Sequence, residues 1–203
     1  MRVLVTGFGP FPGAPSNPSA LLVKALARKR RPALSEIALT THVFTTSYAA
    51  VDRDLPKLLA EKPDVVLLFG LAGRRRRLCI ETRARNALTL LFPAADRRKP
   101  QQNIIAPGAP SSLRGNAPVM RLLSAARGRF PARLSHNAGR YLCNYVFWQA
   151  LQRAHGRRPL VQFVHIPPVR IGPRRQRKHR HHSLAQLVRA AEAVLIALMA
   201  ASR

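Results

Sequence analysis

The chain has 203 residues, 47% of them hydrophobic, and its 35 Lys and Arg against 8 Asp and Glu give a formal net charge of +27 at pH 7. This length can bury one core, so we expect a single domain over residues 1–203. We expect neither a signal peptide nor a membrane span, because the first apolar run is short and the stretch 184–201 contains Arg189 and Glu192; the two cysteines are too few for a disulfide scaffold and favour a cytoplasmic location.

Apolar or β-branched runs alternate with stretches of helical periodicity along the chain. We expect strands at 3–5, 37–46, 64–69, 134–135 and 161–164, and helices at 17–27, 47–61, 117–127, 139–154 and from 184 onward, after an N-cap at Ser183. The segment 73–115 reads as strands and long loops around a site. This alternation predicts an α/β sandwich with a mainly parallel sheet.

The loop after the first strand, residues 7–13, reads Gly-Phe-Gly-Pro-Phe-Pro-Gly. A dinucleotide-binding G-x-G-x-x-G motif needs glycine where Pro12 stands, and a P-loop needs Gly-Lys before Ser or Thr, so neither motif is present. Because open α/β sheets bind ligands at the carboxyl ends of strands, Phe8 and Phe11 could line a small apolar pocket there. They could equally be core aromatics.

Glu81 is one of eight acidic residues and follows a short apolar run. A carboxylate at the end of a strand can accept the N–H of a histidine and fix its tautomer. The alternative is a salt bridge to the arginines nearby.

Cys143 lies near the expected start of the helix 139–154. The free N–H groups of a helix start favour an anion, so we expect a stabilised thiolate there, although a cysteine in an apolar helix is more often simply packed. Cys79 lies between Leu78 and Ile80 on an expected strand, and we assign it to packing.

His165 ends the strand 161–164 and precedes Ile166-Pro167-Pro168. A histidine at a strand end, downstream of a cysteine at a helix start, suits a Cys-His catalytic pair, with a structural role as the alternative. His179, His181 and His182 give only a weak indication of a metal site, because no acidic or cysteine residue accompanies them.

Basic residues gather in three runs, at 28–31, 74–77 and 174–182. They could bind a polyanion such as nucleic acid, or they could be solvated loops. We favour solvated loops, because no aromatic residues interleave the runs and no nucleic-acid-binding motif is present.

In order, these fragments resemble the pyroglutamyl peptidase I family, also called pyrrolidone carboxyl peptidase, over nearly the whole chain. The resemblance is carried by four segments, which are Val5–Phe11 with Asn17-Pro18-Ser19, Gly70–Arg74, Ala138–Asn144, and Phe163–Pro167. It implies a three-layer α/β/α sandwich around a mainly parallel mixed sheet. It also implies a cysteine omega-peptidase that needs no cofactor or metal and removes N-terminal pyroglutamyl residues from peptides.

The resemblance further implies that Cys143 is the nucleophile, His165 the general base and Glu81 the residue that orients the histidine. The matching substrate-pocket positions are Phe8, Phe11, Thr45, Phe92, Tyr141 and Leu142. The family commonly forms oligomers, so a homo-oligomer is left open here.

The chain departs from the family pattern after the glutamate, because Leu91 stands where the family has an arginine. We expect Arg83 or Arg85 to supply that charge. Two alternatives stay open, a divergent member that binds polyanions through its Arg-rich loops and an amidase acting on another cyclic or blocked amide.

Overall fold

The structure, a computed structural model, describes residues 1–12, 14–28, 37–154, 158–170 and 182–203. The basic run 174–182 therefore lies outside the described residues except for His182, and so do His179, His181 and residues 29–31. The strands are β1 (Arg2–Phe8), β2 (Ala38–Phe44), β3 (Val65–Leu71), β4 (Leu78–Glu81), β5 (Arg83–Arg85), β6 (Ser112–Arg114), β7 (Ala132–Ser135) and β8 (Leu160–Ile166). The helices are α1 (Pro18–Ala27), α3 (Tyr48–Ala60), α4 (Val119–Arg127), α5 (Leu142–Gln152) and α6 (Leu184–Ala201).

Six strands form one sheet in the order β2-β1-β3-β8-β4-β7. The pairs of β1 with β2, β1 with β3, β3 with β8 and β4 with β7 are parallel, whereas β4 runs antiparallel to β8. The strands β5 and β6 form a separate antiparallel pair. The reversal at β4 is what makes the sheet mixed.

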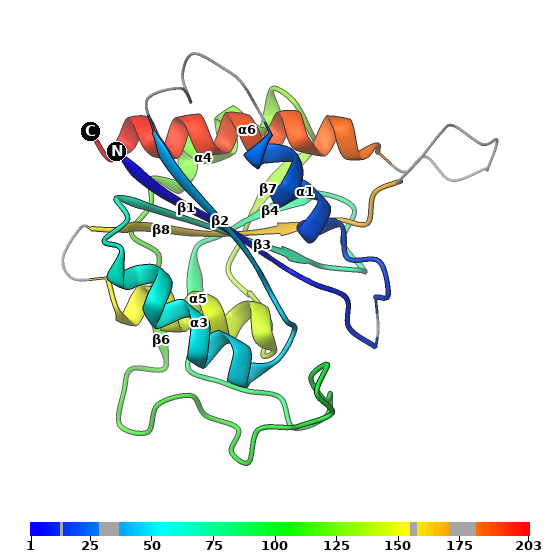
Figure 1. The fold of residues 1–203 in the computed structure, drawn as a ribbon, viewed down its shortest axis with the longest axis vertical. Coiled ribbons are helices and arrows are strands. Elements are labelled where there is room, and N and C mark those ends of the chain that lie inside the picture. Colours follow the sequence, from blue (N-terminus) through cyan, green and yellow to red (C-terminus); the bar gives the residue numbers. More distant parts are fainter. Residues whose placement is uncertain (13, 29–36, 155–157, 171–181) are drawn as a thin grey trace.

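Helices cover both faces of this sheet (Figure 1). On one face, α1 and α4 both pack against α6 and share a hydrophobic cluster with the sheet. On the other face, α3 contacts α5, and the second cluster contains the buried aromatic residues Trp148, Phe147, Phe163 and Phe44. The three-layer α/β/α sandwich around a mainly parallel mixed sheet is therefore confirmed.

Local sequence signals set where the helices begin. The side chains of Asn17 and Ser47 accept hydrogen bonds from backbone N–H groups in the first turns of α1 and α3. Ser183 is the N-cap of α6, as the sequence predicts, and forms a capping box with Gln186. These caps satisfy N–H groups that a helix start leaves without intrahelical partners.

The helix α6 is long and apolar enough to cross a membrane by length and composition alone. In this structure it packs against α1 and α4, and one side of it contributes Leu187, Val194, Leu195 and Leu198 to the core. A core helix of a soluble protein passes the same test, so the feature is weak support for a membrane span. The sequence-based expectation of a packed helix agrees with this arrangement.

Candidate active site

The parallel strands β1, β3 and β8 end at the same edge of the sheet. On β8, His165 is the register partner of Gly70 on β3, and Cys79 on the antiparallel β4 pairs with it from the other side. His165 is thus held in the middle of the sheet between two neighbouring strands, and only 5% of its surface is exposed. Backbone pairing of β8 with β3 and β4 therefore already places the imidazole of His165.

Glu81 comes to His165 from the end of β4. The register of the antiparallel pair and the two-residue period of a strand place Glu81 and His165 on the same face of the sheet. Glu81 Oε1 lies 2.7 Å from His165 Nδ1, and the carboxylate is fully buried. If Nδ1–H donates to this carboxylate, Nε2 is left as the free acceptor of the imidazole.

Cys143 is the second residue of α5, a helix that starts after a backbone turn at Gly139 with φ of +85°. The buried Asn144 fixes this start, because its Oδ1 accepts from Arg85 N at 2.8 Å and its Nδ2 donates to the Arg85 and Ala87 carbonyls at 2.8 and 3.1 Å. The side chain of Asn144 therefore joins the first turn of α5 to β5. These hydrogen bonds fix the position of Cys143, the preceding residue, relative to β5.

Gly70 brings the cysteine next to the histidine. A Cβ atom built on Gly70 would lie 2.6 Å from Cys143 Sγ and 2.7 Å from Phe163 Cζ, so the sulfur rests where a side chain of β3 would otherwise be. Because neighbouring strands are about 4.8 Å apart, a thiol over Gly70 is beside its register partner His165. The structure thus gathers Glu81, Cys143 and His165, which lie far apart in the sequence, at one place.

The sulfur of Cys143 is not a stabilised thiolate, contrary to the sequence-based expectation. Burial first and the charge of Glu81 second raise the pKa of its thiol to about 12, and the charge of Arg75 only partly opposes them. The helix start does not outweigh desolvation here. At neutral pH the sulfur therefore carries its proton, and nucleophilic attack requires a base to remove it.

The effects on the pKa of Glu81 have the opposite outcome. Burial by itself would raise the pKa of its carboxyl group, but the hydrogen bond to His165 and the charges of His165 and Arg75 outweigh burial and lower the pKa below its ordinary value. Glu81 is therefore ionised at neutral pH and can support positive charge on the imidazole.

Arg75 is a site residue that the sequence analysis missed. Its Nη1 lies 2.6 Å from Glu81 Oε1, whereas Arg83 Nε donates to the His136 carbonyl at 2.9 Å. Within the described part of the chain, Arg75 is the only arginine in an ion pair with Glu81. Neither Arg83 nor Arg85 forms such a pair. The sequence offered four adjacent arginines at 74–77 with no local signal to separate them, and only the turn after β3 decides which one points inward.

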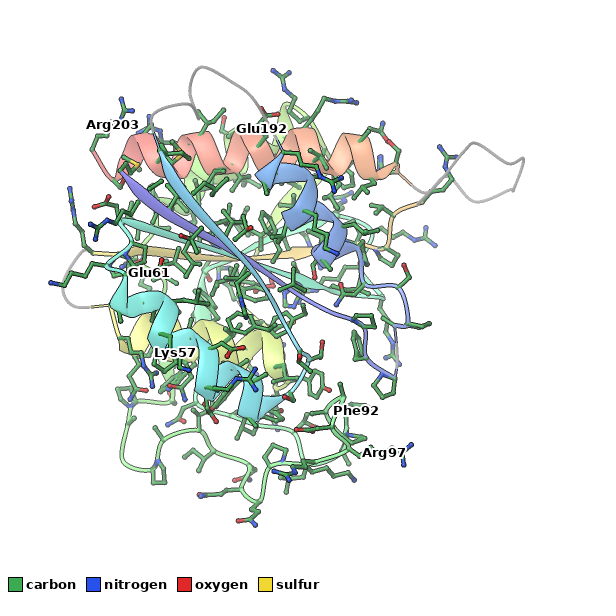
Figure 2. The ribbon with its side chains drawn as sticks, in the orientation of Figure 1. Lys57, Glu61, Phe92, Arg97, Glu192 and Arg203 are labelled. Atoms are coloured by element: carbon green, nitrogen blue, oxygen red, sulfur yellow. The ribbon has the colours of Figure 1, made fainter. Side chains whose placement is uncertain are left out.

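Among the predicted pocket residues, Tyr141 packs in the same hydrophobic cluster as Cys143, and Phe11 lies next to Tyr141. Tyr141 immediately precedes α5, its ring centroid is 6.4 Å from that of Phe11, and its hydroxyl donates to the Pro93 carbonyl at 2.8 Å. That bond ties the loop containing Phe92 to Tyr141. Phe92 itself is 63% exposed, and Figure 2 shows it on the outer loop that also carries Arg97, on the opposite side of the molecule from α6.

The other three residues have different surroundings. Phe8 and Leu142 are buried in the hydrophobic cluster that includes Phe44 and Trp148. Thr45 is exposed at the end of β2, in a segment that is tied to the β1 loop by the hydrogen bond from Thr46 Oγ1 to the Gly9 carbonyl. Phe8 and Leu142 are thus buried, Phe11 and Tyr141 are partly exposed, and Thr45 is exposed.

A cavity of about 370 Å³ is lined in part by Tyr48 and Tyr145, and the ring of Tyr48 lies 6.2 Å from that of Tyr141 and 5.1 Å from that of Tyr145. None of the six predicted pocket residues lines it. Among the residues that the structure describes, no group of three or more His, Cys, Asp and Glu side chains could hold a metal ion.

Comparison with known proteins decides the family. The family described as pyroglutamyl peptidase matches residues 1–203. The chain belongs to the pyroglutamyl peptidase family. The pyrrolidone-carboxylate peptidase of Thermococcus kodakarensis is 33% identical over 171 residues, which cover 82% of this chain and 81% of the relative, and pyrrolidone-carboxylate peptidase 1 of Caldanaerobacter subterraneus is 29% identical over 198 residues, 96% of both chains.

Solved structures of pyroglutamyl peptidases have the same fold. A mutant pyrrolidone carboxyl peptidase from Pyrococcus furiosus aligns over 100% of both chains with a TM-score of 0.87 and 27% identity. The enzyme from Thermus thermophilus aligns over 97% of this chain and 99% of its own with a TM-score of 0.83 and 30% identity. The predicted family and its class, a cysteine-type hydrolase, are confirmed, and these relatives give no support to the polyanion-binding alternative.

Proposed function

We propose that this protein hydrolyses the amide bond after an N-terminal pyroglutamyl residue of a peptide, through Cys143, His165 and Glu81. The observation that carries the proposal is the 2.7 Å contact between Glu81 Oε1 and His165 Nδ1, with the sulfur of Cys143 seated over Gly70, the register partner of His165. A buried acid, an oriented imidazole and a thiol are the three groups that covalent amide hydrolysis by a cysteine peptidase uses.

The chemistry runs through a thioester. His165 Nε2 accepts the thiol proton as Cys143 Sγ attacks the carbonyl carbon of the pyroglutamyl residue, and the imidazolium then protonates the departing amine. Water attacks the thioester, His165 takes a proton from that water, and the proton returns to the sulfur as the free pyroglutamate leaves. Glu81 stays ionised throughout and stabilises the imidazolium.

The start of α5 suits the negative charge that develops on the carbonyl oxygen. Cys143 is the second residue of the helix, and the first N–H groups of a helix have no intrahelical partners. Backbone N–H groups held in this way can donate to an oxyanion beside the attacking sulfur.

The substrate pocket that we propose combines Phe8, Phe11, Thr45, Phe92, Tyr141 and Leu142. Its support is the close approach of Phe11 to Tyr141 and the bond from Tyr141 to Pro93, next to Phe92. A flat five-membered lactam offers two apolar faces to such aromatic side chains, and ring edges with N–H and C=O to polar groups. Peptides with an N-terminal pyroglutamate are the substrates, and the free cysteines Cys79 and Cys143 suit a reducing, cytoplasmic compartment.

Release of a fluorescent amine from a pyroglutamyl amide by the purified protein tests the proposal. We expect Cys143→Ser to lower kcat/KM by about 10³-fold or more, because nucleophile and base act as a unit. Cys79→Ala is the matched control, since it removes the other thiol, which is fully buried, and it should retain most of the activity. Amine release that survives Cys143→Ser, or no release by folded protein in the presence of reductant, contradicts the proposed function.

A further inference from the structure

Arg75 is the one arginine of the run 74–77 that is turned into the protein. Its neighbours Arg74, Arg76 and Arg77 are exposed, whereas 23% of the Arg75 side chain is accessible. The turn between β3 and β4 directs it inward, and Arg75 N donates to the Ala72 carbonyl at 2.9 Å in that turn.

The guanidinium of Arg75 binds two parts of the site at once. Nη1 donates to Glu81 Oε1 at 2.6 Å and to Ser135 Oγ at 3.2 Å, while Nη2 donates to the Asn137 carbonyl at 2.7 Å. Glu81 belongs to β4, and Ser135 and Asn137 belong to the end of β7 and the loop that leads to α5. One side chain therefore joins the acid to the segment that carries Cys143.

The loop after β7 has its own order, and Arg75 completes it. Asn137 N donates to Ser135 Oγ at 3.4 Å, and Gly139 N donates to Asn137 Oδ1 at 3.1 Å. These local bonds set the shape of the loop up to the turn at Gly139, but none of them reaches the carboxylate of Glu81, which the β4–β7 ladder joins to this segment only through its backbone. Arg75 makes the side-chain connection.

The carboxylate of Glu81 is paired with Arg75 as well as with His165. Its two ionic partners, Arg75 and His165, both bind Oε1, and Oε2 has no hydrogen-bond partner among the described residues. A buried carboxylate held only by a neutral imidazole would be poorly compensated. Arg75 thus supplies the fixed positive charge that keeps the acid ionised when the imidazole is neutral.

We propose that Arg75 is a positioning residue of this active site, which holds Glu81 Oε1 as the charged acceptor for His165 and locks the β7–α5 loop that presents Cys143. It acts through these residues and contacts no reacting atom. The proposal rests on the proposed function for its kinetic consequences.

The test compares Arg75→Gln, Arg75→Lys and the exposed control Arg74→Gln in the pyroglutamyl amide assay across about pH 5 to 9. We expect Arg75→Gln to lower kcat by about 10- to 100-fold with little change in KM, because a supporting contact of the catalytic groups is lost. The acidic limb of the kcat–pH profile of Arg75→Gln should move to higher pH. Loss of a positive charge makes protonation of the Glu81–His165 pair easier. Arg75→Lys keeps the positive charge. Its acidic limb should therefore lie at the same pH as that of the wild type, and its kcat should be higher than that of Arg75→Gln.

The result that overturns the proposal is an Arg75→Gln enzyme with the rate and pH profile of Arg74→Gln. An equal loss in Arg75→Gln and Arg75→Lys with an unshifted limb and a lowered Tm would also overturn it, because that is the signature of a purely structural contact.

A second measurement does not need turnover. The rate of iodoacetamide alkylation of Cys143, followed by mass spectrometry against pH, should shift to higher pH in Arg75→Gln only, because the charge of Arg75 favours the thiolate. If the wild-type protein releases no amine, the proposed function fails, and this profile still decides the proposal for Arg75. An unshifted alkylation profile counts against it.

Discussion

At Gly70 the lack of a side chain decides where the nucleophile lies. We predict that Gly70→Ala displaces the sulfur of Cys143, since the new Cβ would approach it to 2.6 Å, and lowers kcat/KM by about 100-fold, with about 1–3 kcal/mol lost from the free energy of unfolding through overpacking. Steady-state kinetics and denaturant unfolding measure the two effects.

Gly73→Ala is the matched control, because a Cβ at Gly73 meets no atom within 4 Å and lies three residues further along the chain. It should leave both quantities close to those of the wild type. Wild-type kinetics in Gly70→Ala would mean that catalysis does not depend on the position of the Cys143 sulfur over residue 70 of β3.

Glu81 links the chemistry of the site to the pH dependence of stability. Its pKa is lowered in the folded protein, so between the folded and unfolded pKa values the unfolded chain binds more protons, and the contribution of Glu81 to stability rises with pH. That contribution is fully present above the ordinary pKa of 4.5 and is lost as the pH falls through the lower folded value.

We therefore predict that the difference in free energy of unfolding between the wild type and Glu81→Gln shrinks as the pH is lowered from about 6 to about 3. Urea unfolding of both proteins at each pH measures it. The same variant should lose about 10²-fold or more in kcat at neutral pH, since a neutral amide cannot stabilise the imidazolium. A stability difference that is constant over this pH range would contradict an ionised, paired Glu81.

At the scale of elements, Asn144 joins the first turn of α5 to β5. We predict that Asn144→Ala lowers the free energy of unfolding by about 1–3 kcal/mol, because it leaves partly buried backbone groups of residues 85 and 87 without these partners. It should also lower kcat, since Cys143 is the preceding residue on that turn. Thermal unfolding and the amide assay report the two effects.

Gln149→Ala, on the same helix but with a partly exposed side chain, is the comparison for helix propensity and should change stability by less than about 0.5 kcal/mol. If both variants behaved alike, the Asn144 bridge would have no special role in holding α5.

At the scale of the whole molecule, a net charge of +27 works against the compact state through repulsion among like charges. We predict that Tm rises by several degrees between about 0.05 and 0.5 M NaCl, because salt shortens the range of this repulsion. Differential scanning calorimetry in chloride salts measures it.

A double variant, Arg74→Glu with Arg76→Glu, changes two exposed side chains and lowers the net charge. Its Tm should depend less on salt than that of the wild type. A wild-type Tm that stays constant or falls with added chloride would show that charge repulsion is not a major term in the stability of this protein.

The sequence by itself determined the order of the elements and the chemical identity of the site. Periodicity predicted the helices and the strands outside 73–115 to within a few residues, and Ser183 was predicted as the N-cap of α6, because these signals act within their own segment. The Glu, Cys and His candidates followed from motif resemblance. One domain over residues 1–203 stays a prediction from length.

The tertiary structure decided what local patterns do not encode. The antiparallel placement of β4 next to β8 brings Glu81 to His165. Arg75 is distinguished from its three neighbours by side-chain partners 60 and 62 residues away in the sequence. The high pKa of the Cys143 thiol is also a tertiary effect, since it comes from burial and from a carboxylate on another strand. Local sequence sets propensity, but desolvation and charge pairing depend on which segments meet in the folded chain.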